Sequence, residues 1–255
     1  MAMKIDKTGE QFKTNEGYII EIIKYNKYSD VLVQFQDEHK AIVPTTVSNC
    51  KTGEIKNPYH PNKYGGYLGQ GKYNCKIYNK QYRYWMSLLI RGCDNSLRDK
   101  LETYKDVAIN QEVYNFQNFC EWWENNFYEI EGETMCIDKD ILVKGNKEYR
   151  FDRMIFAPNR INVLFTKRDS CRGNYPIGVT YHKKNNKYIA KCGILTDNGN
   201  SKMKYLGSYN TPKEAFFAYK EFKEQYIKQI ADEYKDKIPQ RLYDAMYAWE
   251  VEIDD

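Results

Sequence analysis

The alternation of apolar and polar residues near the N-terminus predicts a small β-module. Residues 17–23 form a run rich in β-formers, and in residues 31–36 Val31, Val33 and Phe35 occupy every second position. Residues 41–43 provide a third short apolar run, and the turn-like residues 26–30 separate the first two. A period of two is typical of a strand with one buried face. We expect a small barrel or curled sheet, comparable to an SH3-like module.

A loop follows, because residues 53–80 interleave chain-breaking residues with tyrosines. Its members are Pro58, Pro61, Gly65, Gly66, Gly69 and Gly71, with Tyr59, Tyr64, Tyr67 and Tyr73 between them. Glycine and proline interrupt regular structure, so we expect an ordered loop. Its rings either pack against a neighbouring part of the chain or stack on bases.

Two helices are expected next. Residues 82–92 carry Trp85, Leu88 and Leu89 on one face. A second helix begins near Asn115, and its apolar stripe recurs at helical spacing at Phe116, Phe119, Trp123 and Phe127. Such a stripe indicates a core-facing helix.

Residues 135–165 have the pattern strand, loop, strand, short helix. The strands are expected at 135–137 and 154–156, with a turn at Gly145-Asn146 and a helix within residues 160–165. Three further strands are expected at about 177–182, 187–194 and 202–207, separated by turn residues.

A helix start follows these strands. Thr211, Pro212 and Glu214 supply an N-cap hydroxyl, a proline at the first helical position and a capping-box carboxylate. The buried stripe of this helix is expected at Ala215, Tyr219, Phe222, Tyr226 and Ile230. A last helix begins near Pro239 and leads into an acidic tail.

Together these elements predict an α+β fold: a β-barrel-like N-terminal module, a ββα middle, and a three-stranded antiparallel sheet with a helix. The expected domains are residues 1–80, 81–168 and 169–236, followed by a helix and tail at 237–255. No apolar run is long enough to span a bilayer. The seven cysteines show no CxxC spacing, which disfavours a zinc finger. We therefore expect a cytoplasmic protein without a membrane partner.

Charge is concentrated in one short segment. The chain carries 39 basic and 35 acidic residues, but residues 166–210 carry nine basic and two acidic ones, a net +7. The segments on either side, 81–165 and 211–255, are net acidic at −3 and −4. A local basic patch attracts polyanions whatever the total charge.

This basic segment coincides with the predicted sheet. One face must be covered by the helix, and we expect Ile177, Val179, Ile189 and Leu206 on that side. The other face then carries basic side chains and can enter the major groove of double-stranded DNA. The candidate DNA-binding residues are Arg172, Tyr181, His182, Lys183, Lys184, Lys187, Lys191, Lys202 and Lys204.

Four motifs in this region carry a resemblance. They are Ile177-Gly178-Val179-Thr180-Tyr181, Lys187-Tyr188-Ile189-Ala190, Lys204-Tyr205-Leu206-Gly207-Ser208-Tyr209 and Thr211-Pro212-Lys213-Glu214-Ala215-Phe216-Phe217-Ala218-Tyr219. Their order resembles the ethylene-response-factor (APETALA-type) DNA-binding domain of plant factors and phage endonucleases. That family usually reads guanine with strand arginines, whereas this segment offers lysines. The resemblance thus implies DNA binding dominated by phosphate contacts.

Residues 82–165 resemble the HNH-type nuclease unit that precedes such domains in phage proteins. The matching residues are Trp85, Arg91 to Cys93, Asn115 to Phe119, Trp122-Trp123, Ile137 to Ile141, Gly145-Asn146, Phe156 to Pro158 and Ile161-Asn162. The resemblance implies a ββα-metal fold in which a histidine activates water, an asparagine orients that base, and one divalent metal such as Mg²⁺ is bound.

The expected histidine is missing. The three histidines, His39, His60 and His182, lie outside the segment, and Lys139 stands where the base belongs. The remaining candidate catalytic residues are Asp138, Asp140, Asn146 and Asn162, of which Asp138 and Asp140 are the candidate metal ligands.

Three functions follow from these patterns. The first is a phage-type double-stranded DNA-binding protein whose nuclease unit has decayed and needs no cofactor. The second is an active, Mg²⁺-dependent nicking or homing endonuclease. The third is a phage inhibitor that reuses the nuclease scaffold to bind a host enzyme or defence complex, suggested by the lost histidine, the tyrosine-rich loop and the acidic tail.

Overall fold

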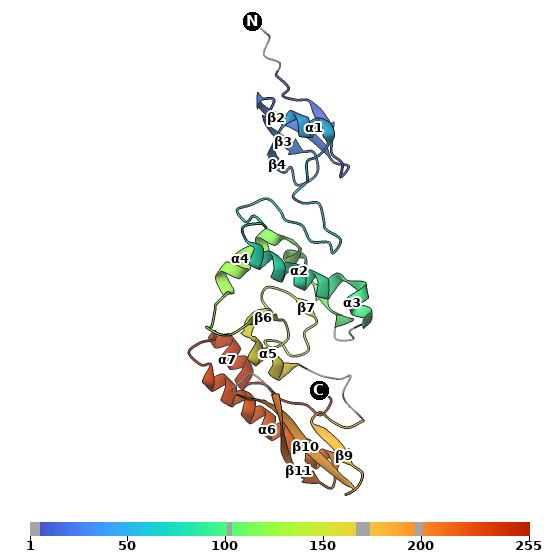
Figure 1. Ribbon diagram of the computed structural model, residues 1–255, viewed down its shortest axis with the longest axis vertical. Coiled ribbons are helices and arrows are strands. Elements are labelled where there is room, and N and C mark those ends of the chain that lie inside the picture. Colours follow the sequence, from blue (N-terminus) through green and yellow to red (C-terminus); the bar gives the residue numbers. More distant parts are fainter. Residues whose placement is uncertain (1–5, 101–103, 167–173, 197–200) are drawn as a thin grey trace. The chain divides into compact units, whose positions relative to one another are not determined.

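The structure is a computed structural model that describes residues 6–100, 104–166, 174–196 and 201–255. It has a mixed α/β fold with several separate sheets (Figure 1). The chain forms two compact units, and each is described by itself. Unit 1 contains residues 1–125 and 148–150, and unit 2 contains residues 126–147 and 151–255. The expected domain boundaries stay predictions, since compactness does not test which segments fold alone.

Unit 1 begins with a four-stranded antiparallel sheet in the order β1-β2-β3-β4. Its strands are β1 (Gln11–Lys13), β2 (Ile19–Lys27), β3 (Asp30–Phe35) and β4 (Ile42–Thr45), and helix α1 (Val47–Thr52) follows. The predicted alternation is confirmed, because Val31, Val33 and Phe35 are fully buried. In the described part of the chain β1 and β4 are not paired, so the sheet is not a closed barrel.

The rest of unit 1 is mainly helical. It contains α2 (Asn79–Cys93), α3 (Asn95–Lys100), the 3-10 helix η2 (Gln111–Tyr114) and α4 (Phe116–Asn126), with a short parallel pair of β5 (Ala108–Ile109) and β7 (Glu148–Tyr149). Trp85 of α2 is buried, and its Nε1 donates to the carbonyl of Val113 at 2.7 Å. Phe127, expected on the stripe of α4, lies beyond that helix and packs edge-on against Phe156 in unit 2.

The glycine- and tyrosine-rich loop is ordered by one buried side chain. Gln117 of α4 accepts from the backbone N–H of Tyr73 at 3.0 Å and donates to the carbonyls of Leu68 and Tyr73. Gly66 lies so close to α2 that a Cβ there would approach Leu89 to 2.3 Å. The tyrosine-rich loop is therefore part of the packed structure of unit 1.

Unit 2 contains the predicted strand, loop, strand, helix segment. Strands β6 (Met135–Asp138) and β8 (Ile155–Pro158) pair antiparallel, and α5 (Asn159–Phe165) follows directly. The loop between the strands starts after Asp138, one residue later than the sequence pattern predicted.

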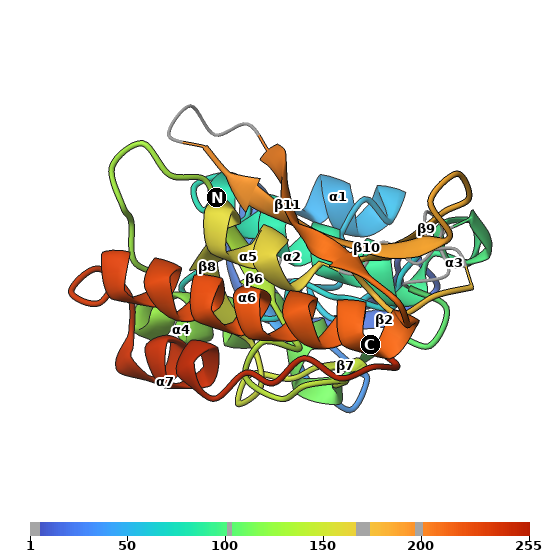
Figure 2. The same cartoon turned by 90° about the horizontal axis from the view of Figure 1, so that it is seen from below.

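The three predicted C-terminal strands are also present. They are β9 (Val179–His182), β10 (Lys187–Leu195) and β11 (Ser201–Tyr209), in the order β11-β10-β9 and antiparallel throughout. Helix α6 (Pro212–Glu233) runs along one side of this sheet, and α7 (Gln240–Tyr247) packs on α6 (Figure 2).

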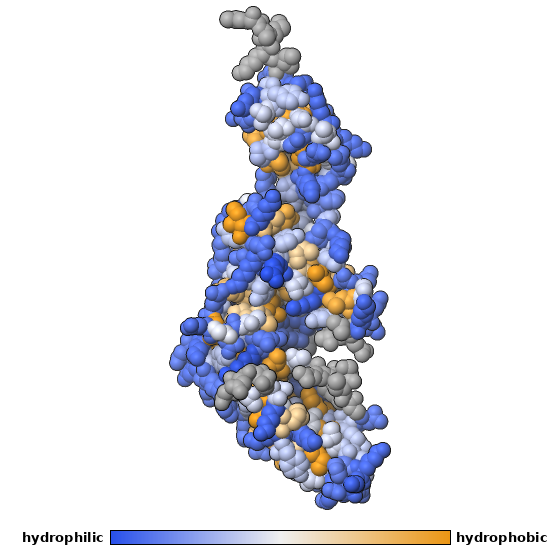
Figure 3. Space-filling view, in the orientation of Figure 1, coloured by the Kyte–Doolittle hydropathy of each residue, from blue (hydrophilic) through white to orange (hydrophobic). Residues whose placement is uncertain are grey.

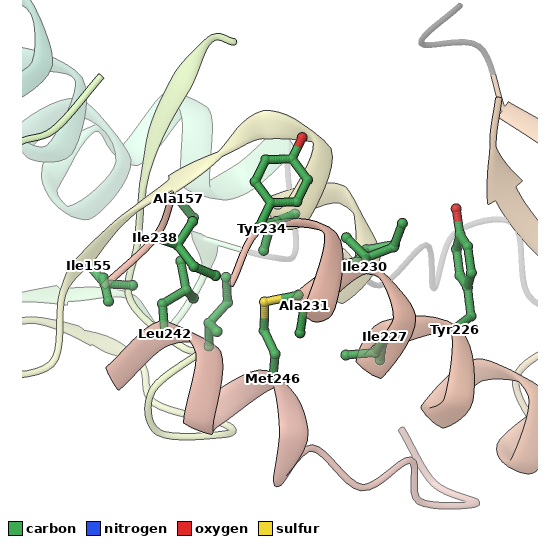
Figure 4. Close-up of a cluster of buried hydrophobic side chains, with 13 residues drawn as sticks. Ile155, Ala157, Tyr226, Ile227, Ile230, Ala231, Tyr234, Ile238, Leu242 and Met246 are labelled. Carbon is green, nitrogen blue, oxygen red and sulfur yellow. The ribbon is translucent and has the colours of Figure 1, made fainter. Parts of the chain in front are cut away.

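Helix α6 contributes to two cores. Ala215, Phe216 and Tyr219 from its first turns pack with Val179, Ala190 and Cys192 of the sheet. Its last turns pack with residues of β8, α5 and α7, and Figure 4 shows this second cluster around Ile227, Ile230 and Ala231. Because a helix of 22 residues is long enough for both contacts, α6 joins the ββα segment to the sheet.

The acidic tail is bound rather than free. Val251 is buried in the core of the sheet, and its carbonyl accepts from Lys220 Nζ at 2.7 Å. Lys144, from the loop between β6 and β8, donates to the carboxylates of Glu252 and Asp255 at 3.0 and 2.9 Å. The tail therefore connects the ββα loop to the sheet domain.

The start of α6 yields a stability prediction. Thr211 accepts from the N–H of Glu214, and the Glu214 carboxylate accepts from the N–H of Thr211, so both halves of the predicted capping box are present. Thr211→Ala removes one acceptor, and we expect it to lower the free energy of unfolding by about 1 kcal/mol in urea denaturation followed by circular dichroism. Thr211→Ser keeps the hydroxyl and is the control. Equal losses in both variants would show that the cap does not stabilise the helix.

Candidate functional site

The pairing register separates the two sides of the C-terminal sheet. Directly paired residues of an antiparallel sheet point to the same side, and neighbours along a strand point to opposite sides. Ala190 is fully buried against α6 and pairs with Val179. Ile189 pairs with Thr180 and Ser208, so these three lie on the side away from α6, which we call the open face. Ile189 was expected under the helix and is on the other side.

Three of the candidate DNA-binding residues lie on the open face. Lys187 and Lys191 are two positions from Ile189 on either side, and Lys187 pairs with His182. Lys183 and Lys184 are exposed in the turn between β9 and β10, where Asn186 takes a left-handed φ of 50°. The open face and this turn thus carry four lysines and a histidine on one continuous stretch of sheet.

Three other candidates lie on the side of α6. Lys204 pairs with the buried Cys192, and its Nζ is 4.5 Å from the ring centroid of Phe222 on α6. Lys202 pairs with Ile194, which is on the same side as Cys192. Tyr181 pairs with Tyr188, which packs against the core on the α6 side, and their ring centroids are 5.2 Å apart. Arg172 lies outside the described residues.

A β-bulge explains why the lysines of β11 change sides. The register shifts between Ala190 and Lys191, so that Gly207 pairs with Ala190 and Tyr205 pairs with Lys191. Leu206 is the extra residue and packs on the core beneath the sheet. Gly207 has a φ of 146°, a conformation that favours glycine. Beyond the bulge Tyr205 and Met203 face the open side, and Lys204 faces α6.

Met203 and Tyr205 are the residues of this face that the sequence reasoning missed. They are 61% and 59% exposed, although both side chains are large and apolar in part. Hydrophobic atoms are visible among hydrophilic ones over the region of β9–β11 (Figure 3). Met203 and Tyr205 alternate with Lys202 and Lys204, which indicates that the two pairs point to opposite sides of the sheet. The charge of the lysines instead favoured placing the lysines on the open face.

In the ββα segment Asp138 is engaged by the backbone. Its Oδ1 accepts from the N–H groups of Asp140 and Ile141 at 2.8 and 2.7 Å, which closes the turn after β6. Burial, and then the nearby Asp140 carboxylate, raises the pKa of Asp138 to about 7. Asp138 therefore shapes the loop in which the candidate catalytic residues lie.

Lys139 and Asn146 bind each other across the loop. The buried Lys139 ammonium donates to the Asn146 carbonyl at 3.1 Å and to Asp140 Oδ2 at 3.0 Å. The Asn146 side-chain amide donates back to the Lys139 carbonyl at 2.6 Å. Asn146 thus holds the backbone of Lys139, the residue at the position where an HNH-type nuclease would have its histidine base.

This arrangement does not fit Mg²⁺. Asp140 is already paired with the Lys139 ammonium, and a second cation beside that ammonium would be repelled. Across the described residues there is no group of three or more histidine, cysteine or acidic side chains that could hold a metal. Asn162 is half-buried on α5, and within the described part of the chain no hydrogen bond joins its side chain to Asp138 or Asp140.

No protein-family model, curated protein or solved structure matches the chain. Among the described residues no helix is both long and apolar enough to cross a membrane.

The raised pKa of Asp138 predicts a pH-dependent stability. An unfolded aspartate titrates near 3.9. Because folded Asp138 holds its proton up to about pH 7, its contribution to the free energy of unfolding is complete below about pH 4 and is lost as the pH rises through 7. Asp138→Asn keeps the acceptor for the two N–H groups and removes the titration. We expect the stability of the wild type relative to this variant to fall between pH 4 and pH 7 in urea titrations.

Asp254→Asn, at an exposed acid outside the loop, is the control for this titration. A constant difference between wild type and Asp138→Asn across the same pH range would contradict the raised pKa.

Proposed function

We propose that the chain is a double-stranded DNA-binding protein of the phage type, which binds through the open face of its C-terminal sheet. In this proposal the sheet and α6 form an APETALA-type domain, the ββα segment is an HNH-like scaffold without catalytic activity, and the N-terminal sheet is an SH3-like module. The chain acts in the cytoplasm, which is the host's if a phage encodes it.

One observation carries the proposal. With α6 covering one side of the sheet, the other side is accessible and displays His182, Lys187 and Lys191, continued by the lysines of the adjoining turn. A three-stranded face with cationic side chains matches the way β-ribbon proteins enter the major groove. The segments that flank residues 166–210 are net acidic, so the attraction for a polyanion is local to this part of the chain.

The basic residues of the open face are mainly lysines, which favour affinity for DNA over recognition of its sequence. An arginine binds guanine through two parallel hydrogen bonds, whereas a lysine acts as a point charge on a flexible stem. The lysines of the open face are therefore suited to phosphate oxygens. Binding through phosphates releases counterions, so affinity should fall steeply as salt is raised.

A gel-shift titration at two salt concentrations tests this proposal. We expect duplex DNA to bind the wild type, with lower affinity at higher salt. The variant Lys187→Ala/Lys191→Ala should weaken binding and reduce the slope of log K against log salt by about two, roughly one for each phosphate contact.

The matched control is Lys228→Ala/Lys235→Ala, which removes the same charge from exposed positions at α6 and after its end. If both double variants lose affinity equally, net charge explains binding and the open face does not. Absence of any duplex binding would refute the proposed function.

A second experiment tests the hypothesis that the ββα segment is a scaffold without nuclease activity. Because Lys139 occupies the position of the base and is paired with Asp140, we expect no nicking of supercoiled plasmid in the presence of Mg²⁺ or Mn²⁺. Nicking by the wild type that is lost in Asp138→Ala and Asp140→Ala would instead establish the nuclease alternative.

A further inference from the structure

The open face has an apolar part as well as a basic part. Met203 and Tyr205 project from β11, two positions apart on the same side. At 61% and 59% exposure they are the most exposed large hydrophobic residues among the described residues of unit 2. Exposed apolar groups that cluster on one face commonly mark a contact surface.

The neighbours of these two side chains leave them open to a ligand. Met203 pairs with Gly193, which has no side chain, and a Cβ built at Gly193 would meet only Met203 Sδ, at 3.8 Å. Tyr205 pairs with Lys191. The apolar strip therefore lies directly beside a cation of the open face and next to a residue that has no side chain.

Position on the sheet separates these residues from the lysines of the turn. Met203 and Tyr205 lie on the edge strand β11, and Met203 pairs with Gly193 toward the end of β10 that is far from the β9–β10 turn. Strand side chains that enter the major groove can contact base edges, whereas lysines beside the groove contact phosphates. Among the groups that base pairs present in this groove, the C5 methyl of thymine is the apolar one. A thioether and an aromatic ring can bury that methyl, but they cannot satisfy the donors and acceptors around it.

We infer that Met203 and Tyr205 form a contact site for the C5 methyl group of pyrimidines, so that the open face prefers thymine-containing duplexes. This inference rests on the proposed DNA-binding function. It also extends to 5-methylcytosine, which presents a methyl at the same ring position. The lysines supply most of the affinity, and the apolar strip supplies a preference among sequences.

The test changes only the methyl groups. One duplex with alternating A·T pairs is compared with the same duplex in which deoxyuridine replaces every thymidine, and one G·C duplex with its 5-methylcytosine counterpart. We expect the wild type to bind each methylated duplex more tightly, by roughly fourfold for every methyl buried. Binding is measured by fluorescence anisotropy at fixed salt.

Two variants assign the preference to residues. Met203→Ser/Tyr205→Ser should bind methylated and unmethylated duplexes alike while keeping the salt dependence of the wild type. Phe217→Ser removes an aromatic ring that is 53% exposed on α6, away from the open face, and should retain the preference. Circular dichroism verifies that both variants are folded.

The outcomes separate this inference from the function on which it rests. Duplex binding by the wild type without any methyl preference overturns the inference and leaves the proposed function standing. A preference that persists in Met203→Ser/Tyr205→Ser overturns the assignment to these residues. Tighter binding of the single strands than of the duplexes overturns major-groove reading, and absence of all duplex binding overturns both proposals.

Discussion

Unit 2 depends on the double packing of α6. A helix of 22 residues is about 33 Å long, and here its first turns bury the sheet while its last turns bury the ββα segment. Phe222 and Trp249 contact both cores and so connect them. The Leu195 N–H also donates to the Tyr226 hydroxyl at 2.7 Å, which fixes the end of β10 to the middle of the helix. A shift of α6 would therefore disturb both segments together.

The same packing decides which side of the sheet can meet a ligand. Small residues, Ala190 and Cys192, face α6 and let the helix approach closely. The bulge at Leu206 and Gly207 then inserts one residue, so that Leu206 still reaches the core while Lys191 and Tyr205 meet on the open face. The chemistry of the open face is thus a consequence of how the covered face is filled.

Most helices and strands of this chain are predictable from its sequence. The side of the sheet to which each strand residue points is less predictable. Some patterns depend only on residues close together in the sequence, and the structure confirms two of them. They are the alternation at Val31, Val33 and Phe35 and the capping box at Thr211. The short β1 and α1 carry too little pattern to be seen. The side of Ile189 could not be predicted, because hydrophobicity favours burial whereas the helix needs the smaller Ala190 beneath it. The side taken by Lys204 depends on the bulge, and the local signal for that bulge is the single glycine at position 207.

The ββα loop is held mainly by contacts to its own backbone. Asn146 bonds to the backbone carbonyl of residue 139, and Asp138 bonds to backbone N–H groups, so neither contact depends on the side chain at position 139. A lysine there also brings its own positive charge to Asp140. This buried ammonium offsets the charge of the Asp140 carboxylate beside it. The backbone contacts and the Lys139–Asp140 ion pair therefore hold the loop together from within the chain.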